Sequence, residues 1–294
     1  MIEETPFRSF VRNFMESKLA VTGLVMLLMV FAIALFAPWI SPQNPYDLAK
    51  LDLMDARMEP GAKSLGSSFT YLLGTDGQGR DMLSAIFYGL RVSLLVGVVS
   101  GVIALTLGGL LGVLAAYVGG RFEALLMRVV DIQLGFPAIL VALILIAVLG
   151  KGVDKIIIAL VCVQWAYYAR TARSAALIER SKEYMEAARG LGLSRARIVL
   201  KHLLPNALPP LIVVGTVQVA HAIALEATLS FLGLGLPTTE PSLGLLIANG
   251  YEYLLSGKYW ISMYPGVALL LTILAINLVG DQLRDQLNPR LARA

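Results

Sequence analysis

The chain has 294 residues, of which 57% are hydrophobic and only 15% are charged, and its mean hydropathy is +0.74. Soluble domains carry about 25% charged residues, so this composition excludes a single soluble core and favours a protein that lies in the lipid bilayer. The one cysteine, Cys162, excludes an internal disulfide and a thiolate metal site, and we expect neither a metal nor a cofactor.

Six apolar segments are long enough to cross the hydrocarbon core as helices, which takes about 20 residues. In chain order they are Leu19–Ile40, Val92–Gly120, Leu125–Gly150, Gly152–Ala169, Leu208–Leu236 and Ser262–Gly280. The fourth is the weakest, because Asp154 and Lys155 stand at its start. The first is too long for the apolar region of a cleaved signal peptide, so we expect it to be retained. The runs are too long for strands, and the sequence predicts an all-α integral membrane protein with six transmembrane helices.

Lysines and arginines are divided unequally between the two sides of this arrangement. Of the 24, 16 fall on the side of the N-terminus and eight on the opposite side. Because an excess of Lys and Arg marks cytoplasmic segments, we expect both termini in the cytoplasm. The predicted organisation is a cytoplasmic N-terminus (1–18), a first transmembrane helix (19–40), an extracytoplasmic loop (41–91), a core of five transmembrane helices (92–284) that includes a cytoplasmic loop (170–206), and a cytoplasmic tail (285–294).

The long cytoplasmic loop predicts two short helices. The first runs from about Ile178 to Leu191, and Gly192 is suited to a left-handed C-cap. Ser194 can cap the second helix, and we expect Pro205 to break its regular continuation into the fifth span. The second helix places apolar residues beside Arg195, Arg197 and Lys201, which suits a protein partner or a lipid headgroup surface. A basic loop that merely sets topology is the alternative.

A spaced pattern in this loop favours a more specific function. Glu186-Ala187-Ala188, then Gly192, then Leu204-Pro205 resembles the EAA motif of permease subunits of ATP-binding-cassette (ABC) importers, and the spacing matches throughout. His202 stands where the motif usually has Ile, and the peptide-importer branch of that family often has His there.

Three further blocks extend the resemblance along the chain. They are Leu73–Asp81 before the second span, Ser230–Gly235 at the end of the fifth, and Gly280–Asp285 with Asn288–Arg290 near the C-terminus. Their order is similar to that of the second, "C-type" permease of dipeptide, oligopeptide and nickel importers.

The resemblance implies a type I ABC-importer permease fold in the bacterial inner membrane. It implies these partners: a second homologous permease, two ABC ATPase subunits, an extracytoplasmic solute-binding protein, a peptide substrate and membrane lipid, with no nucleic acid. The residues expected to couple the pore to the ATPases are Glu186, Ala187, Ala188, Gly192, His202, Leu204 and Pro205. Since no phosphate-binding loop is found, we expect no enzyme activity in this chain itself. Dipeptides, oligopeptides, glutathione, nickel chelates and oligosaccharides all remain open as substrates.

Polar residues inside the spans are functional candidates, because ionisable groups are costly in the bilayer. Gln218 and His221 share a face of the fifth span, and Glu226 lies about 140° around the helix from His221. We expect these three either to line a translocation path or to bond neighbouring helices. In the third span, the spacing of Arg128 and Asp131 predicts a self-neutralising pair.

Small residues recur every three to four positions in the second span. They are Gly97, Gly101, Ala104, Gly108, Gly112, Ala116 and Gly120. Such a stripe allows close approach of helices, so we predict packing within the chain or against a partner.

Two other functional classes make different demands on the sequence. An intramembrane enzyme needs ionisable residues of two spans at one depth, and a lone secondary transporter needs inverted halves. The sequence supports neither.

Overall fold

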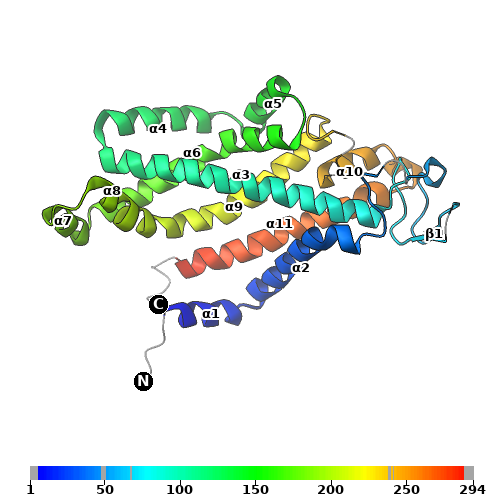
Figure 1. Cartoon of the computed structure of the whole chain (residues 1–294), viewed down its shortest axis with the longest axis horizontal. Coiled ribbons are helices and arrows are strands. Elements are labelled where there is room, and N and C mark those ends of the chain that lie inside the picture. The colour runs from blue at the N-terminus through cyan, green and yellow to red at the C-terminus, as the bar shows by residue number, and fades with distance from the viewer. Residues whose placement is uncertain (1–5, 48–50, 67, 238–239, 241, 288–294) are drawn as a thin grey trace.

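The structure, a computed structural model, describes residues 6–47, 51–66, 68–237, 240 and 242–287. Long helices lie alongside one another in an elongated bundle (Figure 1). The helices are α1 Pro6–Glu16, α2 Lys18–Ile40, α3 Met82–Val118, α4 Gly120–Gly135, α5 Ala138–Leu149, α6 Val153–Arg180, α7 Glu183–Gly190, α8 Arg195–Arg197, α9 Leu204–Phe231, α10 Leu243–Tyr251 and α11 Trp260–Leu287. Ile198–Leu203 between α8 and α9 is π-helical, and short 3-10 turns span Leu53–Asp55 and Leu254–Ser256.

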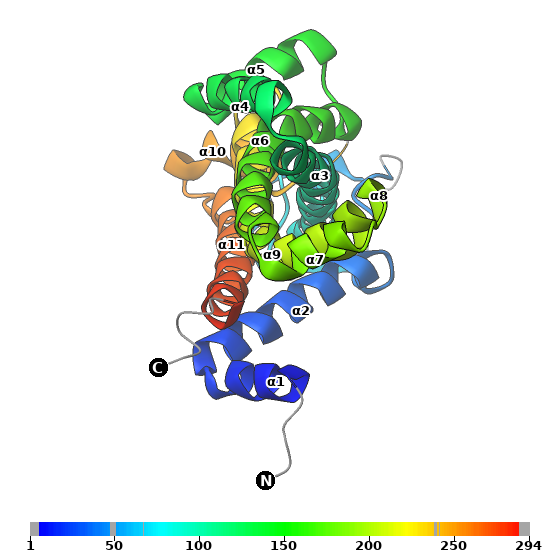
Figure 2. The same cartoon turned by 90° about the vertical axis from the view of Figure 1, so that its left-hand side faces the viewer.

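The two ends of the bundle differ. The α7 end carries α7, α8, the start of α1 and the end of α11, whereas the β1 end carries α10 and a small ribbon (Figure 1). The ribbon pairs β1 Ala62–Lys63 with β2 Thr70–Tyr71 in antiparallel fashion. Viewed from the α7 end, α3, α6 and α9 lie between α4 and α5 on one side and α1 and α2 on the other (Figure 2).

Among the described residues, four helical stretches are long and apolar enough to cross a membrane, so the chain is a membrane protein. They are α2, α3, the run Arg195–Phe231 through α9, and α11, and these confirm the first, second, fifth and sixth predicted spans as helices. The third predicted span is divided into α4 and α5, which meet at a bend of 93°. The fourth lies within α6, which does not meet the same criterion of composition.

The bend between α4 and α5 has a local cause. Phe136 between the two helices is extended, with φ −93° and ψ 144°. It precedes Pro137, and the proline ring disfavours helical geometry in the preceding residue. The sequence prediction of one continuous span at Leu125–Gly150 overlooked this signal.

Helix α3 is the longest element and begins ten residues before the predicted span. Asp81 caps it, because its carboxylate accepts a hydrogen bond of 2.8 Å from the Ser84 amide. At 1.5 Å per residue, its 37 residues extend about 55 Å, which exceeds the roughly 30 Å hydrocarbon core. At least one end of α3 therefore projects beyond the bilayer interior.

The small-residue stripe of α3 packs within the chain, as predicted. A Cβ added at Gly108 would collide with the Trp165 carbonyl of α6, and one added at Gly112 would collide with the Ala169 carbonyl. At Gly97 the added atom would lie 2.5 Å from Ile223 of α9. Glycine thus lets the α3 backbone touch the α6 backbone and the Ile223 side chain of α9. Gly120 lies outside this stripe, since it begins α4 with φ +61° and has open space around it.

The β1 end is held together by buried polar contacts. Asp55 is fully buried and accepts hydrogen bonds from Ser64 Oγ (2.6 Å), the Leu65 amide (2.9 Å) and the Tyr71 hydroxyl (2.8 Å). Nearby, Arg80 and Asp76 form a buried ion pair of 2.7 Å, and both side chains are 1% exposed. The block Leu73–Asp81 therefore acts as a rigid junction between the ribbon and the start of α3.

Candidate functional site

The loop at the α7 end begins where α6 stops. The predicted helix Ile178–Leu191 is wrong in its first part, because Ile178–Arg180 form the last turn of α6. Ser181 Oγ donates to the Ile178 carbonyl at 2.9 Å, and Lys182 is extended with φ −81° and ψ 149°. This interruption restricts the first helix of the loop, α7, to Glu183–Gly190.

Gly192 closes α7 with a left-handed turn, which confirms the predicted cap. Its φ is +70°, and its amide donates to the Arg189 carbonyl at 3.0 Å. The next amide, of Leu193, donates to the Ala188 carbonyl at 3.3 Å. This pair of bonds is the Schellman motif, in which a residue without a Cβ avoids the steric cost of the left-handed region. Ser194 is confirmed as the cap of α8, since its Oγ accepts from the Arg197 amide at 3.4 Å.

Pro205 does not end the helix, but regular α-helical continuation is interrupted just before it, as predicted. The helix continues through the π-helical segment into α9, and the Leu204 amide donates to the Val199 carbonyl five residues earlier. The wider π turn accommodates the proline, which lacks an N–H and crowds the preceding turn of a regular helix. The Asn206 side chain donates to the His202 carbonyl at 2.6 Å, which satisfies one carbonyl of this segment.

The loop has one packed face and one exposed face. Met185 and Ala188 of α7 are buried, and they belong to an apolar cluster with Ile198, Val199 and Leu203 that reaches α3 and α6. By contrast, the residues of the EAA-like pattern that lie exposed are Glu186, Ala187, Gly192 and Pro205, while His202 and Leu204 are half-buried. The buried face thus holds the loop against α3 and α6, and the exposed face leaves Glu186 available to a partner.

The three polar candidates of α9 lie in different environments. Glu226 is fully buried and accepts hydrogen bonds from Ser93 Oγ of α3 (3.0 Å) and Ser230 Oγ (2.8 Å). Ser242, the cap of α10, lies near the same carboxylate. Gln218 is 7% exposed, whereas His221 is exposed. The predicted common face of Gln218 and His221 therefore divides between the interior and the surface of the chain.

Asp131 pairs with Arg170 of α6 and not with Arg128, so the predicted internal pair of α4 is wrong. The neighbouring Glu123 of α4 likewise pairs with Arg173 of α6 at 2.5 Å. Helices α4 and α6 run side by side, so α6 offers cations directly opposite the acids of α4 (Figure 1). An i, i+3 spacing within α4 cannot reveal this partner.

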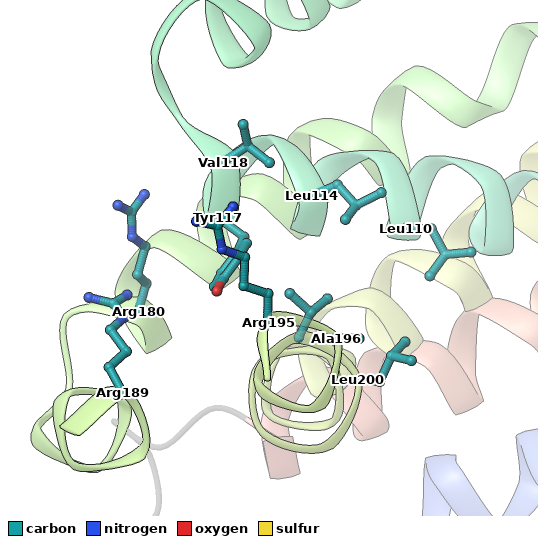
Figure 3. A pocket seen from close by; sticks show the side chains of 10 residues that line it. Leu110, Leu114, Tyr117, Val118, Arg180, Arg189, Arg195, Ala196 and Leu200 are labelled. Carbon is teal, nitrogen blue, oxygen red and sulfur yellow. The ribbon is translucent and has the colours of Figure 1, made fainter. Parts of the chain in front are cut away.

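The part of the chain that the structure describes has several cavities, and two of them lie at opposite ends of the bundle. A cavity of about 700 Å³ lies at the α7 end, between the last turns of α3 and the loop (Figure 3). A second, of about 460 Å³, lies at the β1 end and is lined by polar residues that include Lys151, Asn249 and Glu252. Neither cavity could be predicted from the sequence, because their walls come from segments far apart in the chain. Of the C-terminal block, Gly280–Asp285 lies on α11, and Asn288–Arg290 is outside the described residues.

Comparisons with known proteins agree with this arrangement. Residues 108–293 match the family described as "Binding-protein-dependent transport system inner membrane component", and residues 5–60 match the "N-terminal TM domain of oligopeptide transport permease C". The dipeptide transport system permease protein DppC of Escherichia coli strain K12 is 41% identical over 287 residues, covering 98% of this chain and 94% of that protein. The di/tripeptide transport system permease protein DppC of Pseudomonas aeruginosa strain UCBPP-PA14 is 38% identical, covering 100% and 95%.

A solved structure shows the same fold. An inward-facing MetNI methionine ABC transporter structure superposes with a TM-score of 0.58 at 24% identity, over 70% of this chain and 97% of that one. The chain belongs to the family of inner membrane components of binding-protein-dependent transport systems. Within it, the N-terminal match and the full-length relatives place it among the C-type permeases.

Proposed function

We propose that the chain is one permease subunit of an ATP-driven importer of short peptides in a bacterial inner membrane. The names of the curated relatives support the peptide substrate, and the family description supports delivery by a binding protein. The complete importer contains a second homologous permease, two ABC ATPases that hydrolyse ATP, and an extracytoplasmic solute-binding protein. This chain forms half of the pore.

In the membrane, the chain has six spans with both termini and the α7 end in the cytoplasm. The bent α4–α5 pair counts as one span and α6 as another. The polar side chains of α6 support its inclusion, because Gln164 and Tyr168 are 2% and 0% exposed and so face the bundle interior. The start of α1 and the end of α11 lie at the same end, as an even number of spans requires (Figure 1).

The loop at the α7 end is the coupling element, and the observation that carries this proposal is the Gly192 turn. It holds α7 and α8 at a fixed angle while Ala188 anchors them to the cluster beneath. A partner ATPase that contacts the exposed Glu186 face therefore moves the whole loop. Such differential contact between ATP-bound and ATP-free states is what a transport cycle requires.

The path for substrate passes beside α9. Gln218 and His221 are the candidates for lining it, and the exposed His221 is open to contact by a partner permease. Glu226 is a third candidate, but its three serine contacts support a second role, the joining of α3, α9 and α10.

The test uses the full importer in vesicles, with uptake and ATPase stimulation by loaded binding protein as readouts. We expect Gly192→Val to abolish both, because a β-branched residue resists the left-handed conformation. Gly192→Asn is the matched control and should keep most activity, since Asn tolerates that region. Glu186→Arg should also abolish stimulation while the chain still inserts. Wild-type uptake and stimulation in Gly192→Val and Glu186→Arg would show that this loop does not couple the two subunits.

A further inference from the structure

The cavity at the α7 end combines an apolar wall with a cationic rim. Leu110, Leu114 and Val118 of α3 line one side, and Val199 and Leu200 line the side of the loop (Figure 3). Its volume of about 700 Å³ lies in the range of small-molecule sites, roughly 300–1,000 Å³. Leu110 and Leu200 are 37% and 56% exposed, so the wall is open to an apolar ligand.

Three arginines from three separate elements line the same cavity. They are Arg180 of α6, Arg189 of α7 and Arg195 of α8. Arg180 Nη1 donates to the Ala116 carbonyl at 2.6 Å, which fixes its position at the last turn of α3. The arginines are brought together by the fold, because the chain turns at Ser181 and again at Gly192 between them.

No acidic side chain among the described residues forms a salt bridge with these arginines. The acids nearest in the chain to Arg180 and to the end of α3 are otherwise engaged. Glu179 accepts from Lys182 Nζ at 2.6 Å and from the Tyr184 hydroxyl at 2.8 Å. Glu123 pairs with Arg173 at 2.5 Å. The cavity therefore holds positive charge that an anion from outside the chain can neutralise.

The two features together select one chemical class of ligand. A free inorganic anion uses the arginines and leaves the leucine wall exposed, whereas a neutral apolar molecule does the reverse. A phospholipid with an anionic headgroup uses both, because guanidinium groups bind phosphate in bidentate fashion and an acyl chain packs along the leucines. Tyr117 lies between the wall and the rim (Figure 3), and tyrosine is a residue type enriched where membrane proteins meet lipid headgroups.

We propose that this cavity binds one anionic phospholipid of the cytoplasmic leaflet. Its phosphate lies against Arg189 and Arg195, and one acyl chain lies along Leu110 and Leu114 of α3. Basic pockets on the cytoplasmic side of membrane proteins recognise such headgroups. The leaflet rests on the orientation given under the proposed function. Since the two arginines flank the Gly192 turn, the bound lipid bridges α7 and α8 and braces the coupling loop against the membrane.

The experiment measures lipid retention by the intact importer, delipidated in detergent and titrated with phosphatidylglycerol or phosphatidylcholine, by native mass spectrometry. We expect wild type to retain phosphatidylglycerol and not phosphatidylcholine. The variant R189Q/R195Q should bind phosphatidylglycerol at least tenfold more weakly. The matched control R197Q/K201Q removes two charges from the same loop at residues that do not line the cavity, and it should bind as wild type does.

A second variant separates a shaped site from general attraction between charges. Ala196→Trp fills the cavity without changing the charge, and we expect it to lose phosphatidylglycerol as R189Q/R195Q does. Equal loss in R189Q/R195Q and R197Q/K201Q, or unchanged binding in Ala196→Trp, would overturn the proposal. Displacement of the lipid by an equal concentration of inorganic phosphate would also overturn it and indicate a free-anion site. Lipid retention is read without ATP or substrate, so failure of the Gly192 coupling test is a separate result.

Discussion

The carboxylate of Glu226 on α9 accepts a hydrogen bond of 3.0 Å from Ser93 Oγ on α3, and this contact joins residues 133 positions apart in the chain. Glu226→Ala removes the acceptor and leaves buried hydroxyls unpaired, each at a cost of about 1–3 kcal/mol. We expect a clear fall in the melting temperature and yield of the purified importer. Glu226→Gln keeps an acceptor oxygen and should lose much less stability.

Uptake by the same two variants separates the two roles of Glu226. If its charge guides substrate, Glu226→Gln transports poorly although the importer assembles and melts as wild type does. If Glu226 joins helices only, Glu226→Gln transports normally. Unchanged stability and transport in Glu226→Ala would exclude both roles.

The close contact between α3 and α6 predicts opposite effects at two glycines three positions apart. Gly112→Ala places a Cβ against the Ala169 carbonyl, and we expect a loss of about 1–3 kcal/mol in stability. At Gly109 the added atom meets only the Leu211 side chain at 3.6 Å, an ordinary contact. Since Ala is the better helix former, Gly109→Ala should be neutral or slightly stabilising. Thermal unfolding of the two variants side by side measures the difference, and equal melting temperatures would contradict this packing.

The corrected partner of Asp131 is testable by double-mutant cycles. We expect measurable coupling in stability between Asp131→Asn and Arg170→Gln, and none between Asp131→Asn and Arg128→Gln. The side chains of Asp131 and Arg170 are about half exposed, at 59% and 49%. In a solvated setting their coupling is therefore below about 1 kcal/mol. The exchange of charges in D131R/R170D should recover yield lost in either single variant. Coupling of Asp131 to Arg128 and not to Arg170 would contradict the structure and support the pair that spacing within α4 predicts.

Features that depend on local chemistry were accessible from the sequence. The four most apolar spans follow from hydropathy, because contact with lipid demands long uncharged runs. The caps at Gly192 and Ser194 are set by their own backbone conformations and by bonds within a few residues. The bend before Pro137 also depends on local chemistry, but hydropathy alone predicts one continuous span there and does not reveal the bend.

Features that depend on tertiary neighbours were not accessible. Nothing near Asp131 in the chain indicates Arg170, and nothing near Glu226 indicates Ser93. The sequence also does not show that the helix continues through Pro205, since a π-helical segment upstream accommodates the ring at a place where propensity alone predicts a break. The cavity lined by the three arginines could not be predicted either, because it forms only when the two turns between them bring the arginines together in space.

The unit of residues 51–81, which includes the ribbon at the β1 end, should lose stability only in strong acid. Burial, the largest influence, raises the pKa of the Asp55 carboxyl, but hydrogen bonds from Ser64, the Leu65 amide and Tyr71 outweigh it, so the pKa lies below the ordinary 3.8. Burial and then the bond to Asp55 raise the pKa of Tyr71 to about 12. Because the pKa of Asp55 is lower in the folded state, its carboxylate stabilises the unit above the unfolded value of about 4. That contribution is lost as the pH falls through the folded pKa.

Hydrogen exchange of residues 51–81, corrected for intrinsic rates, measures this effect. We expect steady protection from pH 7 to about pH 4 and a decline below it. Asp55→Asn should reduce protection at neutral pH and flatten the dependence. Glu59→Gln changes an exposed acid of the same unit and serves as the control. A decline in wild type that begins near pH 6 would assign the transition to another group.

The proposed orientation predicts which end of the bundle is reached from outside the cell. In a Cys162→Ala background, single cysteines replace Leu65 and Leu255 at the β1 end and Leu191 at the α7 end, where the leucines are 68%, 102% and 78% exposed. An impermeant thiol reagent, added to cells with a permeable outer membrane, should label the first two and spare the third. All three should label once detergent dissolves the membrane, which shows that each cysteine is reactive. The excess of Lys and Arg at the α7 end is the physical basis, because positively charged segments are retained in the cytoplasm. Labelling of the cysteine at 191 in intact cells, with 65 and 255 protected, would invert the topology and place the EAA-like loop where no ATPase can reach it.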